Sequence, residues 1–183
     1  MPTLQERIAN ERRRMRTVRQ HMAAGIEQQS SGDATFVPFY IAAADYIDAA
    51  MGRLHIQDVR MGDMIREKVE TMDGSIEQAL GELDERLRGA DHHLKLFLAA
   101  RDELKAKGAE ALEHFESAAK IYSDFIASNM GHHGGTTDLS AKLFDLSDWE
   151  YMAAITDEEM QREQELYAQV EAALPDNLKH LAG

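Results

Sequence analysis

The chain has 183 residues, and its 33 acidic residues outnumber its 20 lysines and arginines, which gives a formal net charge of -13. A chain this acidic repels phosphate backbones, so we expect no nucleic-acid partner. It has no cysteine, which excludes disulfides, thiolate metal sites and cysteine nucleophiles. Any bound metal would therefore be held by histidine, aspartate and glutamate.

The apolar stretches of the chain are short. It shows neither an N-terminal apolar signal segment nor an apolar run of about 18 residues, so we expect no secretion and no membrane partner. A cytoplasmic location is the resulting expectation. The length suits one domain over residues 1–183, with a core bundle over about 3–145 and a C-terminal helical extension over 147–174.

The first predicted helix follows Thr3, which opens a capping box, and its apolar residues recur at helical spacing up to the polar segment 28–33. A second helix is predicted to follow Thr35, which can cap it, and to end near residues 73–74. The apolar face of this helix contains an acid, Asp58. Because an unpaired carboxylate there would be costly, we expect it to have a cationic or hydrogen-bonded partner.

The third predicted helix begins with a capping pattern at Ser75 and is broken by Gly108. The apolar stripe of a fourth helix starts at Leu112 and continues in register to His133. Two glycines directly follow it, at positions 134 and 135, and they are expected to end this helix or bend it.

Two further capping boxes begin at Ser147 and Thr156, and they predict a short turn and a last helix that runs to Pro175. Long amphipathic helices joined by short polar links can each bury one stripe against two neighbours. The sequence therefore predicts an all-α protein, an antiparallel up-down-up-down four-helix bundle with an additional C-terminal helix.

Each of the four bundle helices carries a histidine that can point inward. His55 lies three residues before Asp58, so both can lie on one side of their helix. His93 lies near the apolar side of the third helix, whereas its neighbour His92 shares a face with acids and is expected to be solvated. The residues that can face a common interior site are His21, His55, Asp58, His93, His133 and Asp138.

Imidazoles combined with one or two carboxylates suit iron, manganese or zinc, and a bridging carboxylate can hold two ions close together. Each of these histidines taken alone is expected to be an ordinary core or surface residue. Their occurrence on all four helices favours a metal site.

Two segments resemble the hemerythrin-like, or HHE cation-binding, family. The first is FYIAAADYIDAAMGRLHIQD at 39–58, and the second combines the aromatic run 122–126 with histidines 132 and 133, Asp138 and the LFDLSDW of 143–149. The resemblance implies a four-helix bundle with a non-haem iron centre, often di-iron, that binds or senses oxygen, nitric oxide or iron.

The resemblance also implies the ligand set: His21 from the first helix, a pair from the second, His93 from the third, and a pair that closes the site. The two pairs are His55 with Asp58 and His133 with Asp138. Three features depart from the family pattern: the three-residue spacing of the first pair, Phe97 where a further histidine is usual, and the glycines at 134 and 135.

The alternative interpretation is a metal-free bundle that serves as a protein-interaction or regulatory module, and an enzymatic role is the least favoured. A homodimer is compatible with either. The first helix is also rich in arginine, which suits an acidic partner or a membrane surface, but we expect these arginines to pair with the excess of acids elsewhere. They are Arg7, Arg12, Arg13, Arg14, Arg16 and Arg19.

Overall fold

The computed structural model describes residues 3–28, 32–129 and 134–181, and within these ranges the chain is helical and contains no strand. The prediction of an all-α protein is confirmed. The α-helices are α1 (Leu4–Glu27), α2 (Phe36–Lys68), α3 (Gly74–Lys107), α4 (Leu112–Asn129), α5 (Gly134–Leu143), α6 (Leu146–Met152) and α7 (Asp157–Ala173). Two short 3-10 helices, η1 (Gly108–Ala111) and η2 (Asp176–Leu181), complete the described elements.

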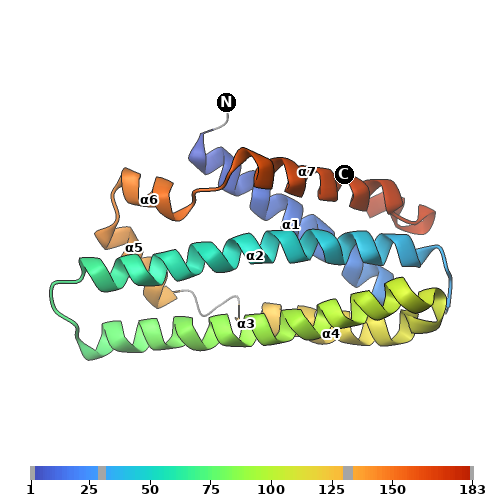
Figure 1. Ribbon diagram of the computed structural model, residues 1–183, viewed down its shortest axis with the longest axis horizontal. Helices are drawn as coiled ribbons and strands as arrows, with labels where there is room; N and C mark the ends of the chain where they lie inside the picture. The colour runs from blue at the N-terminus through green and yellow to red at the C-terminus, as the bar shows by residue number, and fades with distance from the viewer. Residues whose placement is uncertain (1–2, 29–31, 130–133, 182–183) are drawn as a thin grey trace.

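Helices α2 and α3 are the longest, and they run side by side in opposite directions along the whole molecule (Figure 1). Helix α4 packs on α3 and also contacts α1, whereas α7 packs on α2 and also contacts α1. Helix α5 covers the end at which α2 and α3 are joined. None of the helices in the described ranges has both the length and the apolar character that crossing a bilayer requires.

Several helix boundaries follow the predicted local signals. Thr3 caps α1, because its hydroxyl accepts from the Glu6 N–H at 3.2 Å while the Glu6 carboxylate accepts from the Thr3 N–H at 2.8 Å. Thr156 and Glu159 form the same box at the start of α7. Gly108 ends α3 with φ of 63°, a left-handed conformation that glycine adopts without strain.

Other boundaries differ from the predictions. Helix α2 ends at Lys68, about five residues early, because the backbone at Val69 is extended. Asp73 caps α3 in place of Ser75, and its carboxylate accepts from the N–H groups of Ser75 and Ile76. Asp145 likewise caps α6 in place of Ser147, through a box with Asp148.

The described part of α4 runs to Asn129, and the glycine pair at 134 and 135 lies in the first turn of α5. Tertiary packing accounts for the glycine at 135, because a Cβ added there would lie 2.9 Å from the Cβ of Ala79 on α3. Glycine at this position therefore allows α5 to approach α3 closely. The predicted extension of the stripe to His133 lies outside the described residues.

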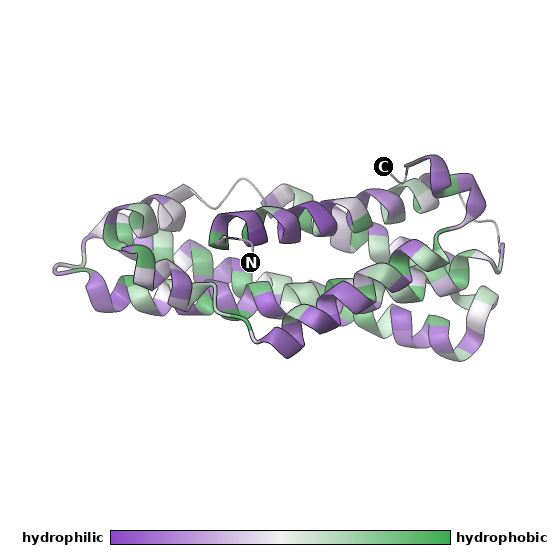
Figure 2. Ribbon diagram, turned by 90° about the horizontal axis from the view of Figure 1, so that it is seen from above, coloured by the Kyte–Doolittle hydropathy of each residue, from purple (hydrophilic) through white to green (hydrophobic). Residues whose placement is uncertain are grey.

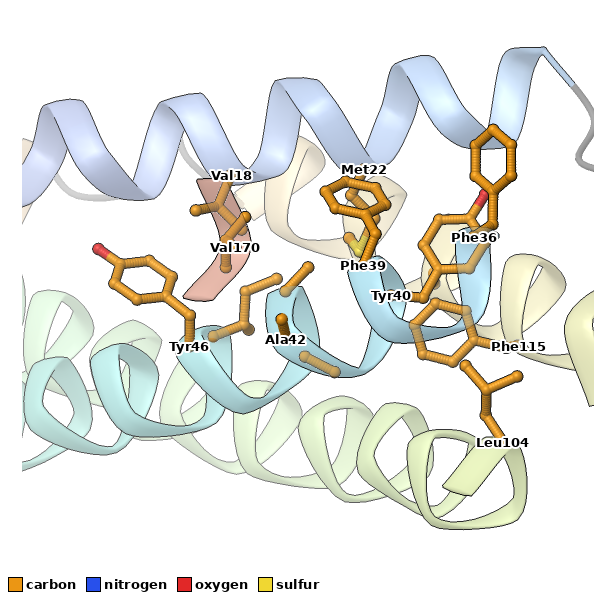
Figure 3. Close-up of a cluster of buried hydrophobic side chains, with 14 of the residues drawn as sticks. Val18, Met22, Phe36, Phe39, Tyr40, Ala42, Tyr46, Leu104, Phe115 and Val170 are labelled. Carbon is orange, nitrogen blue, oxygen red and sulfur yellow. The ribbon is translucent and has the colours of Figure 1, made fainter. Parts of the chain in front are cut away.

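The larger part of the core is aromatic and lies where α1, α2, α3, α4 and α7 meet. In Figure 3, Val18 of α1 and Val170 of α7 lie on the same side of α2 as Met22 and Phe39, and the Tyr40 ring lies against Phe115 with centroids 4.9 Å apart. Helix α7 is thus part of the core. A smaller cluster lies beneath α5 and contains Met61, Met64, Ile65, Leu80, Leu83 and Phe144.

Hydrophilic and hydrophobic residues alternate along the helices, as amphipathic packing requires (Figure 2). Helix α2 is the exception over its first half, where residues 42, 43, 44, 46 and 47 are all buried. It is enclosed there because α1, α3 and α7 cover it from different sides. Polar side chains from these neighbouring helices that face α2 are therefore buried, and they need partners inside the protein.

Candidate functional site

Five of the six candidate metal ligands lie within the described residues, and His133 lies outside them. His55 and Asp58 are on α2, His93 is on α3, His21 is on α1 and Asp138 is on α5. Within residues 3–28, 32–129 and 134–181, no three histidine, aspartate or glutamate side chains gather closely enough to hold a metal ion. The individual contacts explain why these five do not gather.

His93 packs between α3 and α4. Its ring stacks on Phe125 with centroids 4.0 Å apart and planes 10° apart, and its Nδ1 lies 2.8 Å from the Gly89 carbonyl oxygen. A carbonyl can only accept, so Nδ1 carries the proton and donates it. A Cβ at Gly89 would lie 3.0 Å from the Phe125 ring, so the glycine makes room for this stack. His93 is held toward α4, away from the groove between α2 and α3 that His55 lines.

That groove has a volume of about 490 Å³ and is lined by His55, Val59, Asp84, Leu87, Arg88 and Asp91. Its two carboxylates are already paired. Arg66 donates to Asp84 at 2.9 Å, and Lys95 donates to Asp91 at 2.7 Å. The Lys95 hydrogen bond holds the pKa of Asp91 below its usual range.

Asp58 of α2 is paired with Arg86 of α3. The Arg86 guanidinium lies 3.9 Å from its carboxylate, and the aspartate side chain is about one-third exposed. The expectation of a cationic partner is confirmed. A carboxylate whose charge is already balanced by an arginine gains less from binding a cation.

His21 and Asp138 lie in different parts of the molecule. His21 is 3% exposed and is adjacent in sequence to Met22 of the aromatic core. Asp138 is exposed on α5, the helix that covers the smaller cluster. The five described candidates therefore do not fit a di-iron centre, and a site that includes His133 remains a prediction.

A different polar group occupies the interior where α1, α2 and α7 meet. Arg53 of α2 lies between two glutamates, with its Nε 2.5 Å from Glu163 of α7 and its Nη1 3.1 Å from Glu11 of α1. The arginine side chain is 8% exposed, and each glutamate side chain is 5% exposed. We call these three residues the Arg53 cluster.

Neighbouring groups extend the Arg53 cluster. Arg7 contacts Glu11 at 3.5 Å and also donates to the carbonyl of Ala153, which accepts a second hydrogen bond from Gln57 at 3.4 Å. Burial raises the pKa of Tyr46 to about 12, and Glu163 adds to this shift, whereas Arg14 opposes it. These contacts connect the segment before α7 to α1 and α2.

The Arg53 cluster is suited to holding helices together. Its two carboxylates share one guanidinium and are not poised as an acid and a base. Sequence periodicity contains a signal for it that the apolar stripe does not reveal: Glu11 lies seven positions before Val18, and Glu163 lies seven positions before Val170. Residues seven apart share a helix face, so Glu11 and Glu163 lie on the buried faces of α1 and α7.

Comparisons of the chain with protein-family models, with curated proteins and with solved structures gave no match. The resemblance to hemerythrin-like proteins therefore rests on the two segments quoted above. The iron centre and its oxygen or nitric oxide ligand remain predictions.

Proposed function

We propose that this chain is a protein-interaction or regulatory module, built as an up-down-up-down bundle of α1 to α4 with α7 as an added fifth helix. The observation that carries the proposal is the Arg53 cluster, in which buried acids that face the interior are bound by the protein's own arginine. Because these buried carboxylates are already paired with an arginine, we expect the bundle to bind its partners through residues on its outer surface.

The contacts of the candidate ligands support the same proposal. His93 is stacked on Phe125 and bonded to a backbone carbonyl, and Asp58 faces Arg86. Each of these contacts would have to be broken or rearranged for the side chain to turn toward a metal ion. Breaking a partly buried polar contact costs on the order of 1–3 kcal/mol.

The exposed side of helix α6 also supports an interaction role. It has seven residues, none of them buried, and its Leu146 and Tyr151 are 69% and 61% exposed. The Arg60 guanidinium lies 5.7 Å from the Tyr151 ring centroid. An exposed aliphatic side chain and an exposed aromatic one on a single short helix are suited to contact with a partner.

The experiment is photo-crosslinking in cells with a photoreactive amino acid placed at Leu146, and at Lys120 as an exposed polar control. We expect a discrete adduct heavier than the single chain from position 146 and none from position 120. The proposal fails if no discrete adduct forms from position 146. The iron-binding interpretation is the alternative, and a cytoplasmic location remains a prediction under both.

A further inference from the structure

The outer face of α1 carries three exposed arginines, Arg12, Arg13 and Arg16. Arg12 and Arg13 lie four and three positions before Arg16, and side chains at these spacings are neighbours on a helix, so the three guanidinium groups form one patch. The opposite face of the helix holds Val18 and Met22, which are fully buried. We call these three residues the α1 arginine patch.

The patch has no internal counter-ion in the described part of the chain, because none of the ion pairs there includes any of its arginines. The other arginines of α1 behave differently: Arg7 contacts Glu11, and the charge of Arg14 opposes the rise in the pKa of Tyr46. The expectation that the arginines of this helix pair with acids is therefore confirmed for Arg7 and fails for the three arginines of the patch in the described part of the chain.

The acids of α1 do not neutralise the patch either. Glu11 is buried in the Arg53 cluster, and Glu6 is bound in the capping box with Thr3. Glu27 is eleven positions beyond Arg16, which is about 16 Å along the helix and more than the Debye length of about 8 Å at physiological salt. Three adjacent guanidinium groups are thus available on a protein whose net charge is -13.

Guanidinium groups bind carboxylates through paired N–H donors, and arginine is the cation best suited to this geometry. Three kinds of anionic partner could bind such a patch: a nucleic acid, a membrane or an acidic peptide. They differ in how much negative charge they bring close to the rest of the protein. A nucleic acid or a membrane would also bring its many negative charges close to a protein whose net charge is -13, which is repulsive. A short acidic peptide segment contacts the patch alone.

We propose that the α1 arginine patch is the docking site for a short acidic segment of a partner protein. The inference rests on the proposed interaction function and names the chemistry of the partner. The carboxylates of that segment would be bound by Arg12, Arg13 and Arg16 in a contact that weakens as salt rises.

The test is fluorescence anisotropy of the full chain with a labelled hexaglutamate peptide, with hexaglutamine as the uncharged control. We expect saturable binding of hexaglutamate that weakens on raising the salt, and no binding of hexaglutamine. The triple substitution Arg12→Gln, Arg13→Gln, Arg16→Gln should weaken binding about tenfold or more. The matched control Lys95→Gln, Lys120→Gln, Lys142→Gln removes the same charge from three exposed lysines and should weaken it about twofold or less.

Equal weakening by both triple variants, or no binding of hexaglutamate, overturns the inference. So does tighter binding of vesicles containing phosphatidylserine than of the peptide, since that identifies a membrane partner. Self-association of the chain that disappears in the arginine variant also overturns the inference, because the partner is then a second copy of this chain. If the peptide fails while crosslinks from Leu146 persist, the interaction function stands and only the site is wrong.

Discussion

Arg53 of α2 binds Glu163 of α7 through two hydrogen bonds, with Nε 2.5 Å from one carboxylate oxygen and Nη2 3.3 Å from the other. The same guanidinium contacts Glu11 of α1, so one side chain connects three helices. Charges this deeply buried cost much desolvation, and removing one partner leaves another charge uncompensated. The Arg53 cluster therefore fixes where α1 and α7 sit on α2.

Replacing the arginine should be strongly destabilising. Arg53→Met leaves the buried Glu163 without its cation and leaves Glu11 with Arg7 alone, at 3.5 Å, and we expect a loss of about 3–5 kcal/mol in the free energy of unfolding, measured by urea denaturation. The control is the triple substitution Glu11→Leu, Arg53→Met, Glu163→Leu, which removes all three charges and should recover most of that loss. A loss below about 1 kcal/mol for Arg53→Met would show that the cluster is solvated in solution.

Alkaline pH should unfold the protein through its buried tyrosines. The pKa of Tyr46 is raised to about 12, and burial also raises the pKa values of Tyr40 and Tyr122. The unfolded chain loses these protons near pH 10, so the stabilising contribution is complete below about pH 10 and falls as pH rises toward 12.

Circular dichroism and tyrosinate absorbance, measured together on a Tyr151→Phe background that removes the exposed tyrosine, check this dependence, because both should then change in one transition. The variant Tyr46→Phe lacks the titrating hydroxyl and should unfold at a higher pH than the original chain. Tyrosinate formation at pH 10 with the helical signal unchanged would mean that these hydroxyls are open to solvent.

The glycine pair of α5 offers a matched comparison. Gly135→Ala places a methyl group 2.9 Å from the Cβ of Ala79 and should cost about 1–3 kcal/mol, because neither helix can yield without losing contacts. Gly134→Ala meets no atom within 4 Å and should be neutral or stabilising by up to about 1 kcal/mol. Urea denaturation measures both.

A second-site change provides the check on this pair. Ala79→Gly should restore stability to the Gly135→Ala chain, because it removes the atom that the new methyl group meets. Equal effects of the two alanine substitutions would contradict the close approach of α5 to α3.

Several local sequence signals are confirmed, although Asp73 and Asp145 replace Ser75 and Ser147 as helix caps. The capping boxes at Thr3 and Thr156 and the break at Gly108 depend on residues within one turn, and all three are observed. The cationic partner of Asp58 was also expected. The sequence places this carboxylate on an apolar helix face, where it needs a partner, although it does not specify that the partner is Arg86.

The candidate site depended on tertiary pairing, which periodicity does not specify. His93 lies on the apolar side of α3, as predicted, but it faces α4 because Phe125 and Gly89 create a stacking site there. The Arg53 cluster was missed because only apolar residues were used to define the helix faces. Glu11 and Glu163 lie in register with those faces, but their burial depends on where α7 packs.

We propose that the described interior of the bundle is occupied by the protein's own ion pairs and stacked rings, so that these residues are not free to hold iron. The most direct measurement is anaerobic titration of the full chain with ferrous iron, followed by metal analysis and near-ultraviolet absorption after exposure to air. We expect well below one ion per chain and no new absorption band. Binding of about one or two ions per chain, lost together in His55→Ala and His133→Ala, would contradict the claim and establish the metal-binding interpretation.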